Sequence, residues 1–535
     1  MIFKSPHPDV PIPAVPLHQY VLRHAQRLPS KPALIDGPTG RTLSYGQLAG
    51  AVSAAAAGLA ARGFHKGEVF GICCPNLPEY AIAFLGVSAA GGVVTMLHPL
   101  YTASELIVQL QDAKARFVLT VPPLLEKVRE AAGKSGVEEV YVLGAGDGAT
   151  PVTKLLLGGG TPPALAFDTA EDLVTLPYSA GTTGLPKGVM LTHRNLVANL
   201  CQCEGMRSFE SYTEQDVGLA VLPFFHIFGM LASLLLALAQ GATVVTMPRF
   251  DMEEFLSTVE KYRATVAPVV PPIMLELERH PAVDQHDLSS LRLILCGASP
   301  LSEGLAQAVS RRLRCKVAQG YGMTEASPVT HIGPSREKNF KAGAVGWVLP
   351  NTEVMVVEPE TRRPLAVGEP GELWIRGPQI MKGYLNHPEA TADAITPEGW
   401  YRTGDLGYVD GDGYFFVLDR LKELIKYKGQ QVAPAELEAV LLTHPAIADA
   451  AVIPSPDEEA GEVPKAFIVV QAGQRVSAEE VMGFVAARVA PHKRIRRVEF
   501  VGQVPKSLYG KILRRVLVEQ ERLSRASAVQ AHSPG

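Results

Sequence analysis

Cysteine is scarce in this chain, and no two cysteines have the spacing of a metal or redox site. The 535 residues include six cysteines, and no pair of them forms a CxxC motif. Zinc-binding modules and redox dithiols depend on that spacing, so the pattern argues against both. We expect six reduced thiols in a cytoplasmic protein. They are Cys73, Cys74, Cys201, Cys203, Cys296 and Cys315.

An excess of charge of either sign is also missing. The chain has 50 basic and 54 acidic side chains, which leave a formal net charge of −4. A general nucleic-acid binder needs clustered positive charge and a strongly basic domain. The amino terminus lacks the long apolar run of a secretory signal. We therefore expect a cytoplasmic protein with no nucleic-acid partner, and the charge balance leaves open whether it is a monomer or a homodimer.

One long segment lacks charge altogether. Residues 217–248 contain no Asp, Glu, Lys or Arg, and their length alone permits a transmembrane helix. Pro223, His226, Gly229 and Gly241 interrupt the run, and both of its ends have the pattern of short buried strands. The segment therefore predicts a strand, helix and strand of the core, and no integral membrane span.

Helix and strand patterns alternate over residues 42–120. Ser44 is a candidate N-cap for a helix that begins at Tyr45. Thr102 and Glu105 have the spacing of a capping box, in which each side chain satisfies a backbone amide of the other residue. Such alternation predicts an α/β fold with doubly wound, largely parallel sheets. Strands are predicted at residues 69–73, 93–96, 116–120, 172–178, 242–247 and 291–296.

The pattern changes after about residue 345, where hairpins replace the alternation. Residues 406–410 and 414–419 form two strand patterns that flank the turn at 411–413. Beyond residue 420 the order is helix, strand, strand, helix, strand and helix, with a second capping box at Ser477 and Glu480, ending near Leu523. We predict a large multi-layer amino-terminal domain over 1–420 with a β-rich subdomain, a small mobile α/β domain over 421–525, and a flexible tail over 526–535.

The strongest chemical signal is YSAGTTGLPKGVMLTH at 178–193. Its glycines let the backbone approach an anion, its hydroxyl residues add hydrogen-bond donors, and Lys187 adds positive charge. The segment does not match the Walker A pattern GxxxxGK[ST]. A flexible Gly/Thr connector does not explain this density of donors beside a buried strand, so the segment predicts a polyphosphate loop.

This loop resembles the phosphate loop of the adenylate-forming (AMP-binding) superfamily of acyl-CoA synthetases, beetle luciferases and peptide-synthetase adenylation domains. Four later segments resemble other motifs of that superfamily in order: QGYGMTEASPV at 319–329, YRTGDLGYVD at 401–410, DRLKELIKYKGQQVAPAELE at 419–438 and PKSLYGKILRR at 505–515. The closest resemblance is to 4-coumarate:CoA ligases and related fatty acyl-CoA synthetases. It implies an ATP-dependent carboxylate:CoA ligase that uses Mg²⁺ and coenzyme A and forms an acyl-AMP before the acyl-CoA.

The resemblance also implies roles for single residues. Lys511 would bridge the substrate carboxylate and the α-phosphate, Lys426 would act in thioester formation, and Lys422 would be the hinge. Glu325, with Thr183, would hold Mg²⁺. The nucleotide contacts would be Ser179, Gly181, Thr182, Thr183, Gly184, Lys187, Gln319, Gly320, Tyr321, Thr324, Asp405 and Arg420, and the CoA contacts would be Arg249, Lys428, Gly429 and Gln431.

The implied acyl site departs from the plant enzymes. Several 4-coumarate ligases place a Tyr, a Ser and a Lys against the phenol ring, where this chain has Phe228, Ala232 and Leu295. A site without polar partners gains little from a substrate hydroxyl. This favours a cinnamate-like or medium-chain fatty acid, although Pro328 and Val329 keep the 4-coumarate pattern. The other acyl-site residues would be His226, Gly297, Ala298, Gly320 and Gly322, with His226 also catalytic.

Two further activities share these motifs. One is a standalone enzyme that loads a carrier protein, although LLLGGGTPP at 155–163 has no serine after its glycines and so does not mark an appended carrier domain. The other is a luciferase-type oxygenase. Ala180 stands where the superfamily usually has Ser or Thr, so we expect a somewhat weaker affinity for ATP.

Overall fold

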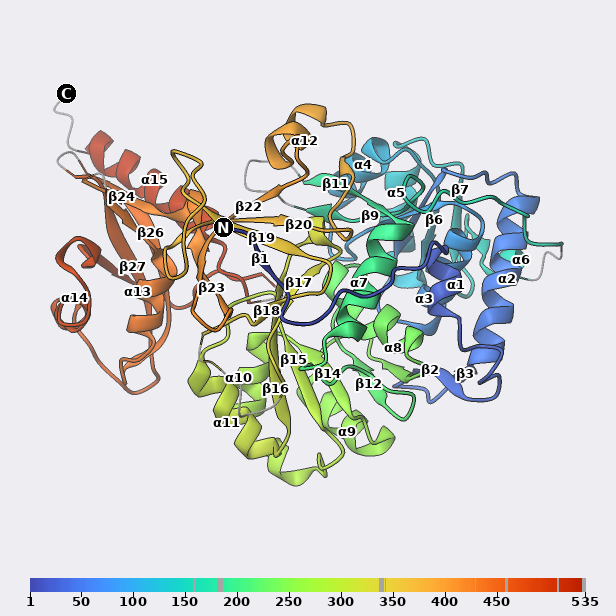
Figure 1. Cartoon of the computed structure of the whole chain (residues 1–535), viewed down its shortest axis with the longest axis horizontal. Coiled ribbons are helices and arrows are strands. Elements are labelled where there is room, and N and C mark those ends of the chain that lie inside the picture. Colours follow the sequence, from blue (N-terminus) through green and yellow to red (C-terminus); the bar gives the residue numbers. More distant parts are fainter. Residues whose placement is uncertain are drawn as a thin grey trace. The chain divides into compact units, whose positions relative to one another are not determined.

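The structure is a computed structural model that describes residues 1–535 apart from 157–159, 180–185, 336–340, 342, 429, 458–459, 508–509 and 532–535; the side chains of 431 and 525–531 are also left out. The chain divides into two compact units (Figure 1). The larger comprises Phe3–Val354 and Ile375–Tyr401. The smaller comprises Met1–Ile2, Met355–Trp374 and Arg402–Gly535, so it includes residues on the amino-terminal side of position 420.

The first sheet of the larger unit is mostly parallel. Its order is β10-β11-β9-β5-β4-β6-β7-β8, and β21 pairs with β11. Helices α2 and α3 pack against each other beside it. The strands are β4 (Val69–Cys73), β5 (Val93–Met96), β6 (Ala115–Thr120), β7 (Glu139–Val142), β8 (Thr150–Pro151), β9 (Leu173–Leu176), β10 (Tyr178–Ser179), β11 (Lys187–Thr192) and β21 (Gly383–Tyr384). The helices are α2 (Tyr45–Ala61), α3 (Pro78–Ala89), α4 (Ala103–Asp112), α5 (Leu125–Ala132) and α6 (Thr153–Leu156).

The second sheet of this unit has the order β18-β17-β16-β15-β14-β12-β13-β2-β3. The pairs from β16 through β2 are parallel, and the outer pairs are antiparallel. Its strands are β2 (Pro32–Asp36), β3 (Thr42–Ser44), β12 (Val217–Ala220), β13 (Thr243–Thr246), β14 (Val266–Val269), β15 (Leu293–Cys296), β16 (Lys316–Gly322), β17 (Val329–Ile332) and β18 (Trp347–Val348). Together the two sheets confirm the predicted doubly wound α/β architecture.

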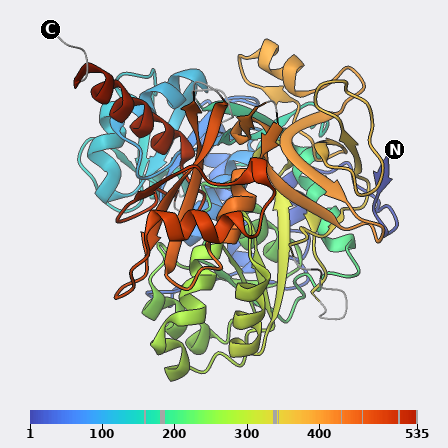
Figure 2. The same cartoon turned by 90° about the vertical axis from the view of Figure 1, so that its left-hand side faces the viewer.

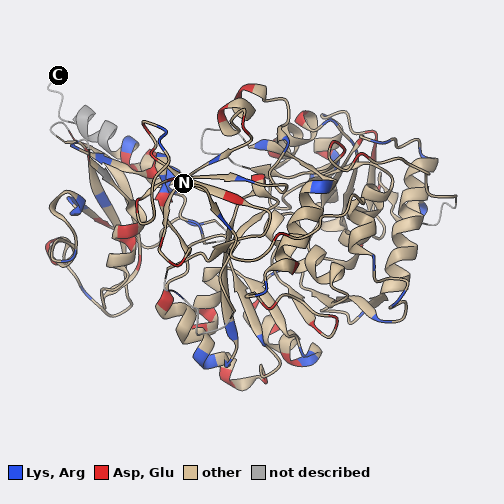
Figure 3. Cartoon of the chain, viewed as in Figure 1, with Lys and Arg blue, Asp and Glu red and all other residues tan. Residues whose placement is uncertain are grey.

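Further helices complete the larger unit. They are α1 (Leu17–Val21), α7 (His193–Gly205), η2 (Gly229–Leu235), α8 (Leu236–Ala239), α9 (Met252–Tyr262), α10 (Pro271–Arg279), α11 (Glu303–Leu313), η4 (Thr324–Ala326) and α12 (Pro388–Ala394). Figure 1 shows α10 and α11 together beside β15 and β16. On α9 and α11 acidic residues lie in the first turn and basic residues in the last, the arrangement that the helix dipole favours (Figure 3).

Local signals in the sequence locate the helix starts. Ser44 caps α2 and accepts a hydrogen bond from the amide of Gln47. Thr102 and Glu105 form the predicted capping box of α4, and Ser477 and Glu480 form that of α14. The predicted caps are therefore confirmed. They could be predicted from the sequence because a cap depends only on residues within one helical turn.

The uncharged segment 217–248 is buried in the core of the larger unit. It consists of β12, the π-helical turn η2, α8 and β13, as the interrupting prolines and glycines predict. Gly229 must be a glycine, since a Cβ there would lie 2.2 Å from the Pro223 carbonyl oxygen. In the described parts of the chain, no helix is both long enough and apolar enough to cross a bilayer. The prediction of a core segment is confirmed.

All six cysteines are free thiols in buried positions. Burial raises the pKa of Cys73 and of Cys315 to about 12, so both are protonated at neutral pH.

The smaller unit contains a compact sheet with the order β25-β24-β27-β26, and β28 pairs with β27. Its elements, coloured orange to dark red, face the viewer in Figure 2. After the hairpin of β22 (Tyr401–Val409) and β23 (Phe415–Arg420) come η6 (Leu421–Glu423), β24 (Ile425–Tyr427), β25 (Gln430–Val432), α13 (Pro434–Leu441), β26 (Ile447–Asp457), β27 (Gly461–Val470), α14 (Ala478–Ala486), β28 (Arg497–Phe500) and α15 (Arg514–Ala531). From α13 onward this is the predicted order of elements; α15 continues beyond Leu523 into the stretch for which the sequence predicts a tail. The remaining strands of the chain are β1 (Phe3–Lys4), β19 (Glu353–Val357) and β20 (Gly371–Arg376).

Candidate active site

The predicted phosphate loop connects two paired strands. Strands β10 and β11 are antiparallel, and Ser179 lies opposite Lys187. The ends of the segment are therefore close in space, as a loop that surrounds one anion requires. The Lys187 ammonium lies 5.4 Å from the centroid of the Tyr384 ring, within the range of a cation–π contact. Ala180, Gly181, Thr182, Thr183 and Gly184 lie outside the described residues.

Tyr384 connects this loop to Glu325. It pairs with Val189 of β11 through the β21–β11 ladder, and its hydroxyl donates to Glu325 Oε1 at 2.9 Å. The backbone amide of Met381 donates to the Glu325 carbonyl oxygen at 2.8 Å. Glu325 is only 5% exposed. Tyr384 could not be recognised from the sequence, because nothing in KGYLN distinguishes this tyrosine from an ordinary strand residue.

Three buried amide side chains of α7 fix the backbone around Glu325. Asn195, Asn199 and Gln202 are spaced by four and three residues, so they project from one face of the helix. Asn195 donates to the carbonyls of Pro378 and Ile380, Asn199 exchanges two hydrogen bonds with the backbone of Val329, and Gln202 donates to Gln379 Oε1. This helix therefore holds β17 and the segment that leads to Tyr384 in one arrangement.

The nucleotide motif 319–325 runs from the carboxyl end of β16 into η4. In the parallel β15–β16 pair, Gln319 lies opposite Cys296, and Gly320 to Gly322 then pair antiparallel with β17. Gly322 must be a glycine, since a Cβ there would lie 2.0 Å from the Pro328 carbonyl oxygen. Ligands of open α/β sheets bind at the carboxyl ends of the parallel strands, where this motif lies. Tyr321 and Thr324 are partly exposed there.

The predicted acyl-site residues form an apolar group in the same region. A Cβ on Gly297 would lie 3.2 Å from Cζ of Phe228 and 3.4 Å from the Gly320 carbonyl oxygen, so Phe228 packs directly against the backbone there. Leu295 and Ala232 are 6% and 2% exposed. Ala298 follows Gly297 with a positive φ of 72°, and Val329 is held by α7. The structure therefore brings Phe228, Leu295, Gly297 and Gly320 together.

His226 is a neutral side chain at pH 7. Burial, followed by the nearby His98, lowers the pKa of His226 to about 4. Its Nδ1 accepts a hydrogen bond from the Phe228 amide at 3.2 Å, which assigns the proton to Nε2. The ring can therefore donate a hydrogen bond without carrying a charge.

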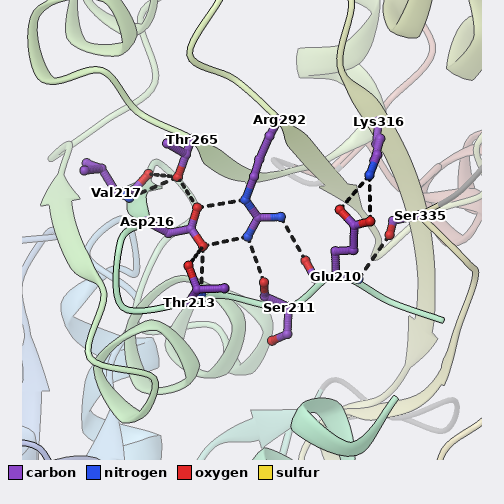
Figure 4. Close-up of polar contacts among 9 residues, drawn as sticks. All are labelled: Glu210, Ser211, Thr213, Asp216, Val217, Thr265, Arg292, Lys316 and Ser335. Atoms are coloured by element: carbon purple, nitrogen blue, oxygen red, sulfur yellow. Dashed lines mark hydrogen bonds and ion pairs between the residues drawn. The ribbon is translucent and has the colours of Figure 1, made fainter. Parts of the chain in front are cut away.

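A network of polar contacts holds the opposite, amino-terminal ends of these parallel strands (Figure 4). Asp216 precedes β12, Thr265 precedes β14, Arg292 precedes β15 and Lys316 begins β16. Arg292 donates to both carboxylate oxygens of Asp216, at 2.8 and 2.7 Å, and Thr265 donates to Asp216 Oδ1 at 2.7 Å. Lys316 pairs with Glu210 at 2.6 Å.

The Asp216 carboxylate is strongly stabilised in its charged form. Burial by itself raises the pKa of Asp216, but hydrogen bonds from Arg292, Thr265 and Thr213 outweigh it and lower the pKa to about 2. Asp216 is 4% exposed and the Arg292 side chain 30%, so the carboxylate is desolvated while the guanidinium is only partly so. The network fixes the amino-terminal ends of β12, β14 and β15. The predicted acyl-site residues Leu295 and Gly297 lie at the opposite, carboxyl end of β15.

In the smaller unit, the residues predicted to bind ribose lie opposite each other. Asp405 pairs with Arg420 across β22 and β23, and Arg420 Nε lies 3.0 Å from Asp405 Oδ1. Asp405 is 4% exposed, and its backbone amide donates to the Thr403 hydroxyl at 3.0 Å. A buried carboxylate held by a guanidinium keeps a fixed acceptor direction, as recognition of a diol requires.

Lys511 lies in a tight turn of the same unit. The Ser507 amide donates to the Lys511 carbonyl oxygen at 2.8 Å, the Gly510 amide donates to the Ser507 carbonyl, and Gly510 has a φ of 77°. The residue as a whole is exposed. Partial burial of its ammonium, followed by the charge of Arg420, lowers the pKa of Lys511, while Asp405 and Glu423 act in the opposite direction. Lys511 therefore lies within electrostatic reach of the Asp405–Arg420 pair.

The predicted thioester residues lie on a short hairpin that sequence analysis did not foresee. Lys426 of β24 is opposite Gln431 of β25, and both Lys426 and Lys428 are exposed. Lys422 lies in η6, between the two hairpins of this unit. Gly429 and the Gln431 side chain lie outside what the structure describes. Arg249, in the larger unit, is an exposed residue after β13.

Two family models and several known proteins match this chain. The family model described as AMP-binding enzyme matches residues 21–385, and that described as AMP-binding enzyme C-terminal domain matches residues 436–511. The chain is 44% identical to 4-coumarate–CoA ligase 1 of Petroselinum crispum over 523 residues, 97% of this chain and 96% of the relative. It is similar to the anthranilate CoA ligase AuaEII in complex with anthranoyl-AMP (TM-score 0.88, 26% identity, 97% and 99% of the two chains). It is also similar to ATP-bound MatB from Rhodopseudomonas palustris (TM-score 0.86, 30% identity, 94% and 98% of the two chains).

Proposed function

This chain belongs to the AMP-binding enzyme family and is an AMP-forming acid:CoA ligase, and from that premise we propose that its acid is an arylpropenoate of the cinnamate and 4-coumarate type. The observation that carries the proposal is the pair of apolar side chains, Phe228 and Leu295, against the backbone of Gly297 and Gly320, with Ala232 buried in the same core cluster. The Phe228 ring packs against the Gly297 backbone, and Leu295 Cδ1 lies next to Gly320, so the surroundings of these strand ends are apolar. The family's 4-coumarate–CoA ligases, which match along nearly the whole chain, support the same class of acid.

In the first half-reaction a carboxylate oxygen bonds to the α-phosphorus of ATP, and pyrophosphate leaves. Both reactants are anions, so catalysis depends on positioning and on neutralising charge. We assign positioning of the phosphates to the loop that ends at Lys187, positioning of the ribose to Asp405 and Arg420, and charge neutralisation at the reacting oxygens to Lys511. His226, as a neutral donor, would orient the acyl group without competing for a phosphate.

Glu325 fits the role of a magnesium ligand. Mg²⁺ in nucleotide sites is held by one or two carboxylates together with substrate phosphates, and when bound it neutralises phosphate charge. The buried Glu325 carboxylate, at the start of the nucleotide motif's helical turn, would supply such a protein ligand. Thr183, its predicted companion, lies outside the described residues.

The choice of acid can be tested with three substrates. Because no polar side chain among Phe228, Ala232 and Leu295 can pair with a phenol, we expect kcat/KM for cinnamate to equal or exceed that for 4-coumarate, with a difference of less than about tenfold. Octanoate should be activated more slowly than either. Acyl-CoA products quantified by mass spectrometry with ATP, Mg²⁺ and CoA give the three values. A preference for 4-coumarate of about 100-fold or more would contradict the apolar site, and a preference for octanoate would contradict the aryl class.

The second half-reaction should depend on Lys426. Its side chain is exposed on the β24–β25 hairpin, and its backbone amide donates to Glu462 Oε2 at 2.8 Å. We expect Lys426→Ala to slow transfer of the acyl group from acyl-AMP to CoA about 100-fold, the usual cost of removing one charged transition-state contact, and to leave ATP–pyrophosphate exchange within about twofold. Lys493→Ala, which removes another lysine of this unit, half-buried and paired with Glu436, is the control. Equal losses in both half-reactions would reject the assignment.

A further inference from the structure

Tyr384 occupies a position that joins three separate parts of the nucleotide site. Its backbone belongs to β21, which pairs with β11 at the exit of the phosphate loop. Its ring lies under the Lys187 ammonium, and its hydroxyl donates to Glu325. One residue therefore contacts the loop strand, the loop lysine and the carboxylate.

The backbone of Tyr384 is itself held firmly. Its amide donates to Thr391 Oγ1 of α12 at 2.9 Å. On either side of it, the Lys382 amide donates to Met190 and the Leu385 amide donates to Gly188, at 3.0 and 2.8 Å. The hydroxyl therefore extends toward Glu325 from a fixed base.

The hydrogen bond has a directional effect on the carboxylate. A carboxylate has two oxygens and about four acceptor positions, and the Tyr384 hydroxyl engages Oε1 of Glu325. The bond limits rotation of the carboxylate and directs its remaining lone pairs. Bonds of this kind, to a group that ligates a metal, commonly set the affinity for that metal.

We infer that Tyr384 is a positioning residue for MgATP, which orients the Glu325 carboxylate and the Lys187 ammonium toward the metal-bound phosphates. The inference rests on the proposed role of Glu325. It assigns Tyr384 no contact with the reacting atoms, so the residue should affect the metal dependence of nucleotide binding and not the choice of acid.

The test is the Mg²⁺ dependence of ATP binding, measured by isothermal titration calorimetry on the full chain without acid or CoA. Tyr384→Phe removes the hydroxyl and keeps the ring beneath Lys187. We expect it to raise the Mg²⁺ concentration for half-maximal ATP binding about tenfold, as loss of a hydrogen bond to a charged group does. KM for the acid should stay within about twofold. Tyr262→Phe is the matched control, because it also removes one tyrosine hydroxyl bond, to the Gly37 carbonyl at 2.9 Å.

A double-mutant cycle with Glu325→Gln separates the possible results. The inference is supported if Glu325→Gln and Tyr384→Phe each raise the Mg²⁺ requirement and if Tyr384→Phe adds less than about twofold in the Glu325→Gln background. A shift for Glu325→Gln with none for Tyr384→Phe overturns the inference and leaves the role of Glu325 intact. No shift for Glu325→Gln overturns that role and the inference with it. Fully additive shifts, or an equal shift in Tyr262→Phe, also overturn it, because Tyr384 would then act independently of the carboxylate.

Discussion

Replacing Lys511 with alanine should reduce ATP–pyrophosphate exchange by about 1,000-fold, because one preorganised charge at the reacting oxygens is worth about that much. Lys511 lies in a turn closed by hydrogen bonds to Ser507, close enough to Asp405 and Arg420 to be affected by their charges. The ammonium would be the group that lets a carboxylate approach a phosphate. The measurement is incorporation of labelled pyrophosphate into ATP with cinnamate present.

The same variant should keep the second half-reaction. With chemically prepared cinnamoyl-AMP and CoA, we expect Lys511→Ala to form thioester within about tenfold of the unaltered chain, since no phosphate is attacked in that step. Lys506→Ala is the control, because Lys506 pairs with Asp449 at 2.7 Å and has no role in the proposed mechanism. Undiminished pyrophosphate exchange in Lys511→Ala would remove the central residue of the proposed mechanism.

Replacing Asp216 with alanine should lower the free energy of unfolding of the larger unit by about 3 kcal/mol. The change removes the charged partner of the Arg292 guanidinium, which keeps its hydrogen bonds to the Glu210 and Ser211 carbonyls, and breaking a buried pair from one side costs about 3–5 kcal/mol. Because 30% of the Arg292 side chain is exposed, we expect a loss of stability at the lower end of this range. The measurement is the shift of the urea midpoint of the larger unit. Asp287→Ala, which breaks the exposed Arg263–Asp287 pair, should hardly move that midpoint.

The Asp216 network also predicts how stability depends on pH. The pKa of Asp216 is lowered from 3.8 to about 2, so the folded state favours the charged carboxylate. Its contribution is fully present above pH 4 and is lost as the pH falls through about 2. The difference in stability between the unaltered chain and Asp216→Ala should therefore shrink as the pH is lowered from about 4 to 2. A difference that stays constant over this range would mean that the carboxylate is not held in its charged form.

Much of the fold could be predicted from the sequence, because helix caps and Pro or Gly interruptions act only on residues a few positions away. The capping residues Ser44, Thr102 and Ser477 and the interruptions in 217–248 each act on their own neighbourhood. The type of the helical turn η2 and the three-residue strands of the β24–β25 hairpin were not foreseen, since elements this short have no measurable periodicity.

The candidate site likewise contains residues that a local motif identifies and residues whose partners are distant in sequence. Resemblance to family motifs located Glu325, Asp405 and Lys511, whose neighbours in sequence belong to the motifs. Tyr384 is 59 residues from Glu325 in sequence, and Arg292 is 76 residues from Asp216. Their roles depend on which strands pair and on which helices carry buried amides, so a single sequence contains no local pattern from which these partnerships could be deduced.

The burial of all six cysteines offers a practical opportunity. Because each thiol is enclosed, and burial disfavours its reactive thiolate, the folded chain should take up maleimide dyes very slowly. One cysteine engineered on an exposed position of each unit would then accept fluorophores selectively. Energy transfer between the two dyes would then test the prediction that the smaller unit is mobile, without a cysteine-free background having to be built first.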